Sequence, residues 1–205
     1  MNQNKYGYMK GIGMSALHTT LKRITKFGLI LMMGVSMTAC FGDQHWKEEV
    51  QLGDGRIIVV ERDLITESGG DEWAINRSGS KPKEYRIRFE YPLDSGKTIE
   101  WKSTKADSGR WPELPLVLDV EEGFPVVFSR FYDSVGCDIY LKYVYQNGVW
   151  VEERLPSVFE PHATNLFLKF SADISSVDLK TKRKLNSDVG FRHIQQVGPK
   201  HPYCR

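Results

Sequence analysis

The clearest catalytic chemistry in this sequence involves a histidine, in the polar cluster at residues 160–165. Glu160 and His162 lie there, directly before an apolar segment. A histidine next to a carboxylate can serve as a general base, so His162 is the one catalytic candidate. The alternative is a polar loop that enters a strand. Glu152 and Glu153 are adjacent, and in a strand they would point to opposite faces, so they do not form a catalytic pair.

Familiar catalytic and phosphate-binding signatures are missing from the sequence. It contains no G-x-S-x-G, no H-E-x-x-H, no P-loop and no G-x-G-x-x-G. We therefore expect a non-enzymatic binding protein that needs no cofactor. The rival hypothesis is an envelope hydrolase that uses His162 and nearby carboxylates.

Tryptophans provide a second kind of candidate site, because their rings can stack on sugars. Trp101 and Trp150 follow the inward periodicity of their predicted strands, which favours packing in the core. Trp73 and Trp111 lie in less patterned surroundings. These two are the tryptophans that we assign to a possible binding surface.

An apolar run at residues 27–39 follows three basic residues, which is the order of a secretory signal. The run ends in Met37-Thr38-Ala39-Cys40, which resembles the lipobox of bacterial lipoproteins, with Met37 in place of the usual Leu. The resemblance covers only residues 22–41. It implies cleavage before Cys40 and a lipid on that cysteine. In lipoproteins of enteric type, Asp after the cysteine marks retention in the inner membrane, so Phe41 implies delivery to the outer membrane.

The resemblance divides the chain into a signal peptide at residues 1–39, a lipidated tether at 40–45 and a periplasm-facing domain at 46–205. The signal is long, and Met14 could be the true start. One alternative is an ordinary cleaved signal with a chance cysteine. The other is a retained membrane helix, but only sixteen uncharged residues separate the flanking charges, whereas a spanning helix needs about 20.

With Cys40 lipidated in an oxidising compartment, the two other cysteines form the pair Cys137 and Cys204, which we predict to be disulfide-bonded. A competing metal site could use His201 and Cys204, which have H-x-x-C spacing. A zinc site needs three or four ligands, and no second pair matches. We therefore predict no metal site.

Charge argues against nucleic acid as a partner. Five basic residues precede Cys40, which leaves 23 basic against 26 acidic residues, a net charge of −3, in the mature chain. The mature chain therefore lacks the excess of basic residues that is typical of nucleic-acid-binding proteins. The predicted partners are the membrane, through the lipid on Cys40, and an envelope protein, a glycan or a toxin that this protein would neutralise.

The mature chain is predicted to form strands joined by turns. Apolar and polar residues alternate with a period of two, and turn-forming residues separate the runs. Four hairpins are predicted, around Gly53-Asp54-Gly55, Pro92–Gly96, Glu121-Glu122-Gly123 and Asn147-Gly148.

The last of these hairpins has the strongest turn signal, because Asn-Gly tolerates the positive φ angles of a type I′ turn. With those two residues at the tip, Tyr145 faces Trp150, Val144 faces Val151 and Lys142 faces Glu153.

Three further segments complete the prediction. Residues 66–83 are predicted to be a long loop, and Ser176 to Asn186 a short helix with Val177, Thr181 and Leu185 on one face. The remaining C-terminal stretch is predicted to be irregular. The expected fold is all-β, an antiparallel sandwich or open barrel built from hairpins with one short C-terminal helix.

Overall fold

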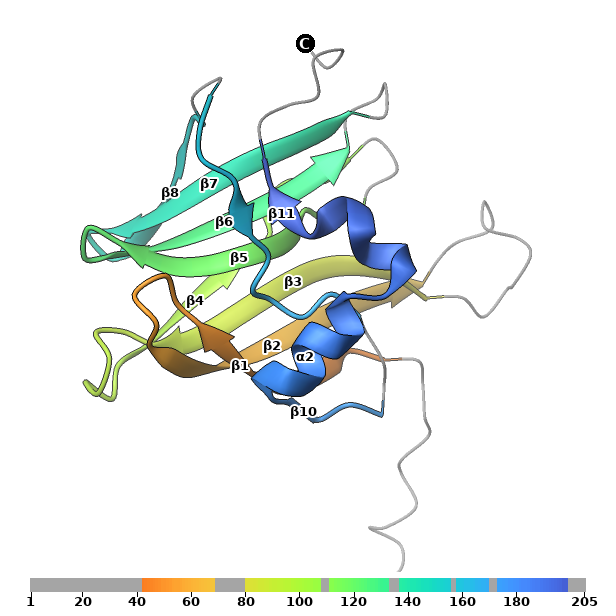
Figure 1. Cartoon of the computed structure of the whole chain (residues 1–205), viewed down its shortest axis with the longest axis horizontal. Helices are drawn as coiled ribbons and strands as arrows, with labels where there is room; N and C mark the ends of the chain where they lie inside the picture. Colours follow the sequence, from red (N-terminus) through yellow and green to blue (C-terminus); the bar gives the residue numbers. More distant parts are fainter. Residues whose placement is uncertain are drawn as a thin grey trace, which may run out of the picture. The chain divides into compact units, whose positions relative to one another are not determined.

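The computed structural model describes residues 42–68, 80–107, 111–132, 137–155, 158–169 and 173–198. They all belong to one unit of the chain, residues 41–205. Within these ranges the fold is all-β with one short α-helix near the C-terminus, which confirms the predicted class (Figure 1). No helix among the described residues is long and apolar enough to cross a membrane.

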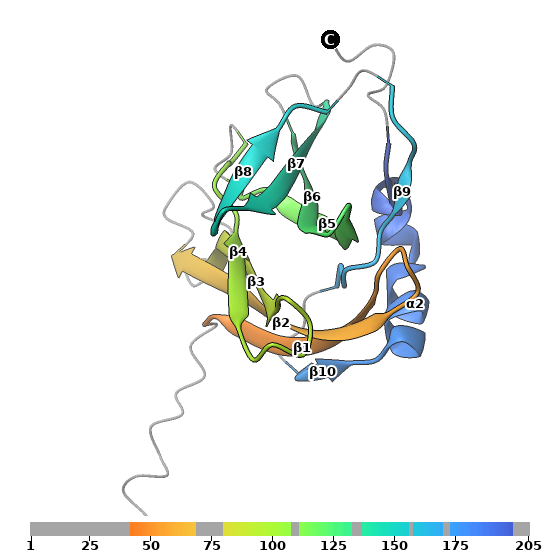
Figure 2. The same cartoon turned by 90° about the vertical axis from the view of Figure 1, so that its left-hand side faces the viewer.

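Two larger sheets face one another as the layers of a sandwich (Figure 2). The five-stranded sheet has the order β10-β1-β2-β3-β4, in which only β10 is parallel to its neighbour. Its strands are β1 (Gln44–Gln51), β2 (Ile57–Ser68), β3 (Ser80–Glu90), β4 (Thr98–Lys102) and β10 (Ser176–Val177).

The four-stranded sheet is an antiparallel meander in the order β5-β6-β7-β8. Its strands are β5 (Leu114–Glu121), β6 (Phe124–Tyr132), β7 (Asp138–Gln146) and β8 (Val149–Glu153). A two-stranded sheet is formed by β9 (His162–Ala163) and β11 (Gln196–Val197). The helix α2 (Leu179–Asn186) and a 3-10 helix (Val189–Ile194) precede β11.

All four predicted hairpins are present. At the tip of the β7–β8 hairpin, Asn147 and Gly148 have φ angles of 52° and 86°, as a type I′ turn requires. The predicted register is confirmed, because Tyr145 pairs with Trp150 and Val144 with Val151.

The main core fills the space between the two large sheets. Apolar side chains that face inward from the strands of both sheets meet there. Trp101 is almost completely buried, as predicted. A second cluster lies on the other side of the four-stranded sheet, where Phe128 and Val144 contact Ile194 and Val197 from the C-terminal segment. The four-stranded sheet therefore has an apolar cluster on both faces.

The predicted helix starts too early. Ser176 and Val177 instead pair with Lys47 and Glu48 of β1, and the helix begins at Leu179 with Asp178 as its N-cap. Backbone hydrogen bonding to an open sheet edge satisfies these two residues before the helix begins.

The predicted apolar face of that helix is also wrong. The buried residues on α2 are Lys182 and Asn186, whereas Thr181 is exposed and Leu185 is only partly buried. Polar side chains replace the expected apolar stripe because they have hydrogen-bonding partners beneath the helix.

Two other predictions need correction. The prediction of a loop over residues 66–83 is wrong at both ends, because β2 continues to Ser68 and β3 starts at Ser80, and the residues between them lie outside the described part of the chain. The C-terminal stretch contains a 3-10 helix and β11, where irregular structure was predicted.

Candidate functional site

A cavity of about 600 Å³, here called the end cavity, opens where α2, β9, β5 and the β1–β2 turn meet. Figure 1 shows β1 beside α2, and Figure 2 shows β9 on the same side of the molecule as α2. A volume of about 300–1,000 Å³ is typical of small-ligand sites. Its lining includes Gly53, Asp119, His162, Asn165, Lys182 and Arg183.

The β1–β2 turn is fixed to β5 by a direct contact. The Gly53 amide donates a hydrogen bond of 2.8 Å to Asp119 Oδ1. A Cβ atom at Gly53 would lie 2.6 Å from Asp119 Oδ2, so a larger residue here would displace the Asp119 carboxylate.

Asn165 connects the segment after β9 to both sheets. Its Oδ1 accepts from the Leu118 amide at 3.0 Å, and its Nδ2 donates to the carbonyl oxygens of Leu118 and Gln51 at 2.8 and 3.0 Å. One amide side chain thus fixes two walls of the end cavity.

A buried charge cluster of Glu48, Arg62 and Lys182 supports the helix wall. Glu48 is 1% exposed, and its two carboxylate oxygens accept from Arg62 NH1 at 2.6 Å and from Lys182 Nζ at 3.0 Å. The Phe167 amide also donates to Glu48, at 2.8 Å. Burial lowers the pKa of Lys182, and Glu48 opposes that shift. The strand alternation of Trp46, Glu48 and Val50 could have indicated an inward Glu48, but sequence reasoning missed this cluster.

His162 lies in the wall of the end cavity, but its contacts do not form a catalytic pair. Its ring stacks on Phe128, with centroids 4.4 Å apart. Asp119, the carboxylate of the cavity lining, accepts hydrogen bonds from the amides of Gly53 and Val120. Within the described ranges, no hydrogen bond joins His162 to a carboxylate. This arrangement provides no oriented general base.

Of the other predicted site residues, two lie in the described part of the chain, namely Trp111 and Cys137. Trp111 is 38% exposed, and its amide donates to Asp107 at 2.8 Å in a loop away from the end cavity. Cys137 is disulfide-bonded. Cys40, Trp73 and Cys204 lie outside the described residues.

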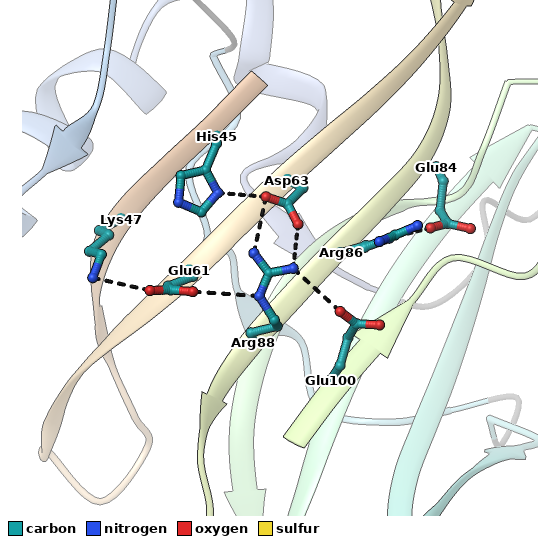
Figure 3. Close-up of polar contacts among 8 residues, drawn as sticks. All are labelled: His45, Lys47, Glu61, Asp63, Glu84, Arg86, Arg88 and Glu100. Atoms are coloured by element: carbon teal, nitrogen blue, oxygen red, sulfur yellow. Dashed lines mark hydrogen bonds and ion pairs between the residues drawn. The ribbon is translucent and has the colours of Figure 1, made fainter. Parts of the chain in front are cut away.

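The outer face of the five-stranded sheet carries a network of ion pairs, shown in Figure 3. Arg88 contacts three carboxylates, with Asp63 at 2.5 and 3.2 Å, Glu100 at 3.3 Å and Glu61 at 3.5 Å. His45 Nδ1 lies 2.6 Å from Asp63. The network covers four neighbouring strands and makes this face polar, and the Asp63 side chain at its centre is only 11% exposed.

These contacts shift the carboxylate pKa values in the network. Burial raises the pKa of Asp63, but the hydrogen bonds from Arg88 and His45 outweigh it, so the pKa is lowered. The hydrogen bond from Lys47 lowers the pKa of Glu61. Both carboxylates are therefore held in the charged form.

No group of three His, Cys, Asp or Glu side chains within the described residues is arranged to hold a metal ion. Comparisons of the sequence with protein-family models and with curated proteins, and of the structure with solved structures, found no match.

Proposed function

We propose that this chain is a lipid-anchored protein of the bacterial envelope, most consistent with the outer membrane, whose β-domain binds an envelope component or partner protein in the end cavity. The lipid on Cys40 would tether the domain, with two or more acyl chains holding it stably. The sequence from Met37 to Cys40 supports this anchor.

The observation that carries the binding proposal is the end cavity with its fixed walls. Asn165, Asp119 and the buried charge cluster hold four chain segments around it. A site that is formed before the ligand arrives avoids part of the ordering cost of binding. The cavity lining has cationic groups, a carboxylate and amides, which suits a polar ligand.

Binding is a better proposal than hydrolysis because His162 stacks on an aromatic ring and has no hydrogen bond to a carboxylate among the residues that the structure describes. If the rival hypothesis were right, His162→Ala would abolish the biological activity of the protein. We expect that variant to keep part of the activity, because His162 is one wall residue of the end cavity and not a reacting group.

The anchor is tested by intact-mass spectrometry of the protein from bacterial membranes, with Cys40→Ala as the comparison. We expect a mature chain that begins at Cys40 and carries acyl mass, and loss of that mass in the variant. An unlipidated mature chain would contradict the anchor.

Ligand binding is tested in cells with a photo-crosslinking amino acid in place of Ala163, which lines the end cavity and is exposed. The matched control replaces Val158, which is 84% exposed and lies outside the cavity lining. We expect an adduct of defined mass only from position 163. No adduct, or the same adducts from both positions, would reject the end cavity as the site.

A further inference from the structure

Two opposite charges line the end cavity without being paired with each other. Arg183 lies on α2 and Asp119 on β5. Arg183 is exposed and Asp119 is half-buried, so solvent reaches both residues. Within the described ranges, neither of them takes part in an ion pair. The cavity therefore offers one accessible cation and one accessible carboxylate.

Contacts with the protein hold these two side chains apart. Arg183 NH2 donates to Gln51 Oε1 at 2.8 Å. Asp119 Oδ1 accepts from the amides of Gly53 and Val120 at 2.8 and 2.7 Å. Gln51 and Gly53 are two residues apart, so their α-carbons are separated by no more than about 7 Å. Both charges are thus anchored to one short stretch of chain beside the cavity.

Most neutral polar groups of the lining are already used by the protein. Asn165 binds three backbone groups, as described above. The Asn186 side chain accepts from one backbone amide at 3.0 Å and donates to one carbonyl at 2.8 Å. Thr164 Oγ1 and Gln195 Nε2 also donate to backbone carbonyl oxygens. The groups left for a ligand are therefore mainly the charged ones.

The second cation of the lining, Lys182, is not available to a ligand. Its side chain is 4% exposed, and its Nζ donates to the Glu48 carboxylate and the Glu49 carbonyl.

Arg183 and Asp119 keep free hydrogen-bonding capacity. Among the residues that the structure describes, Arg183 uses one of its five N–H donors, and Asp119 Oδ2 accepts no hydrogen bond. A guanidinium group binds a carboxylate through two parallel hydrogen bonds, and a carboxylate oxygen accepts from an ammonium group. The two residues are therefore complementary to a molecule that carries both charges.

We propose that the end cavity binds a zwitterion, which is an amino acid or a short peptide with an ammonium group and a carboxylate. The ligand carboxylate binds Arg183, and the ligand ammonium group donates to Asp119. A ligand with only one of these charges leaves the other residue without a counter-charge. This inference rests on the proposed function, because it names the ligand class of the same cavity.

The test titrates the detergent-solubilised full mature protein with each of the twenty amino acids and with dialanine, followed by calorimetry. We expect saturable binding of at least one of them, and the tighter class shows whether the ligand is a free amino acid or a peptide. The N-acetylated and C-amidated forms of the tightest ligand each lack one charge. Each should bind about tenfold more weakly, because a charged hydrogen bond is lost. No binding, or equal binding of all three forms, would overturn the proposal.

Two variants connect each ligand charge to one residue. Arg183→Gln should weaken zwitterion binding about tenfold and leave binding of the C-amidated form unchanged. Asp119→Asn keeps an oxygen for the Gly53 amide, and it should weaken zwitterion binding equally and leave the N-acetylated form unchanged. Lys184→Gln and Glu122→Gln are matched controls at exposed positions outside the lining, and both should keep the original affinity. Equal losses for all three ligand forms in both variants would overturn the direct contacts.

The photo-crosslink at position 163 separates this inference from the proposed function. It reports occupancy of the end cavity whatever charges the ligand carries, because Ala163 is part of the lining. An adduct without zwitterion binding would reject this inference alone. Absence of the adduct would reject the proposed function.

Discussion

Charged side chains lie on both faces of the five-stranded sheet, and their burial decides how much each contributes to the stability of the fold. Arg62 and Glu48 point into the core, where a charge is tolerated only with a hydrogen-bonded partner. Apart from those of Asp63, the pairs on the outer face are more exposed, and most exposed pairs contribute little to stability. The buried charge cluster is therefore the more sensitive of the two.

At the residue scale, Lys182→Met should lower the free energy of unfolding by about 2 kcal/mol, because Glu48 and the Glu49 carbonyl lose a charged hydrogen-bond donor while Arg62 still neutralises Glu48. Lys184→Met, an exposed position on the same helix, should change it by no more than about 0.5 kcal/mol. Urea denaturation of both variants measures the difference. Equal effects would show that the ion pair does not hold α2 in place.

Asp63 makes the free energy of unfolding depend on pH in the acidic range. Its pKa is lower in the folded chain than in the unfolded one, so its contribution is complete above about pH 4, the ordinary value for Asp, and is lost as the pH falls further through the folded pKa. Asp63→Asn should remove this part of the acid dependence. Denaturation from pH 6 to pH 2 tests it, and an unchanged slope in the variant would contradict it.

At the scale of elements, turns fix the strand register, and the β7–β8 hairpin is the clearest case. Gly148 has a φ of 86°, so Gly148→Ala should lower the free energy of unfolding by about 1 kcal/mol. Gly190 has no positive φ and open space around its Cβ position, so Gly190→Ala is the matched control and should be neutral or slightly stabilising. Thermal unfolding distinguishes them, and a larger loss in the control would contradict the role of the turn.

At the scale of the whole molecule, the C-terminal segment holds the sandwich together. Val177 pairs beside β1, Lys182 enters the buried charge cluster, and Ile194 and Val197 cover the four-stranded sheet. Contacts between residues far apart in sequence thus close both cores.

A disulfide that includes this segment would add to that closure. Cys137 is disulfide-bonded, and we predict Cys204 as its partner. Non-reducing peptide mapping should find a peptide that joins the two, and Cys137→Ser should lower the free energy of unfolding by roughly 4 kcal/mol. A peptide joining Cys137 to Cys40 would contradict both the pairing and the lipid anchor.

The sequence by itself determined the local part of this structure. Alternation with a period of two identified strands such as β3, and Asn147-Gly148 specified both a turn and the pairing of Tyr145 with Trp150. These features depend on neighbouring residues, whose conformational preferences are present in the unfolded chain. The signal at Cys40 is local in the same way, and its consequence stays a prediction.

Only the tertiary structure decided which polar residues come together. His162 was singled out from sequence, yet Phe128 lies beside it where a carboxylate was expected. Glu48 meets Lys182, and Glu113 meets Tyr143, across long separations in the chain. Ser176 and Val177 likewise pair with β1, which is distant in sequence. Partners of sheet edges and of buried charges are set by proximity in the folded chain, and no local sequence pattern encodes that proximity.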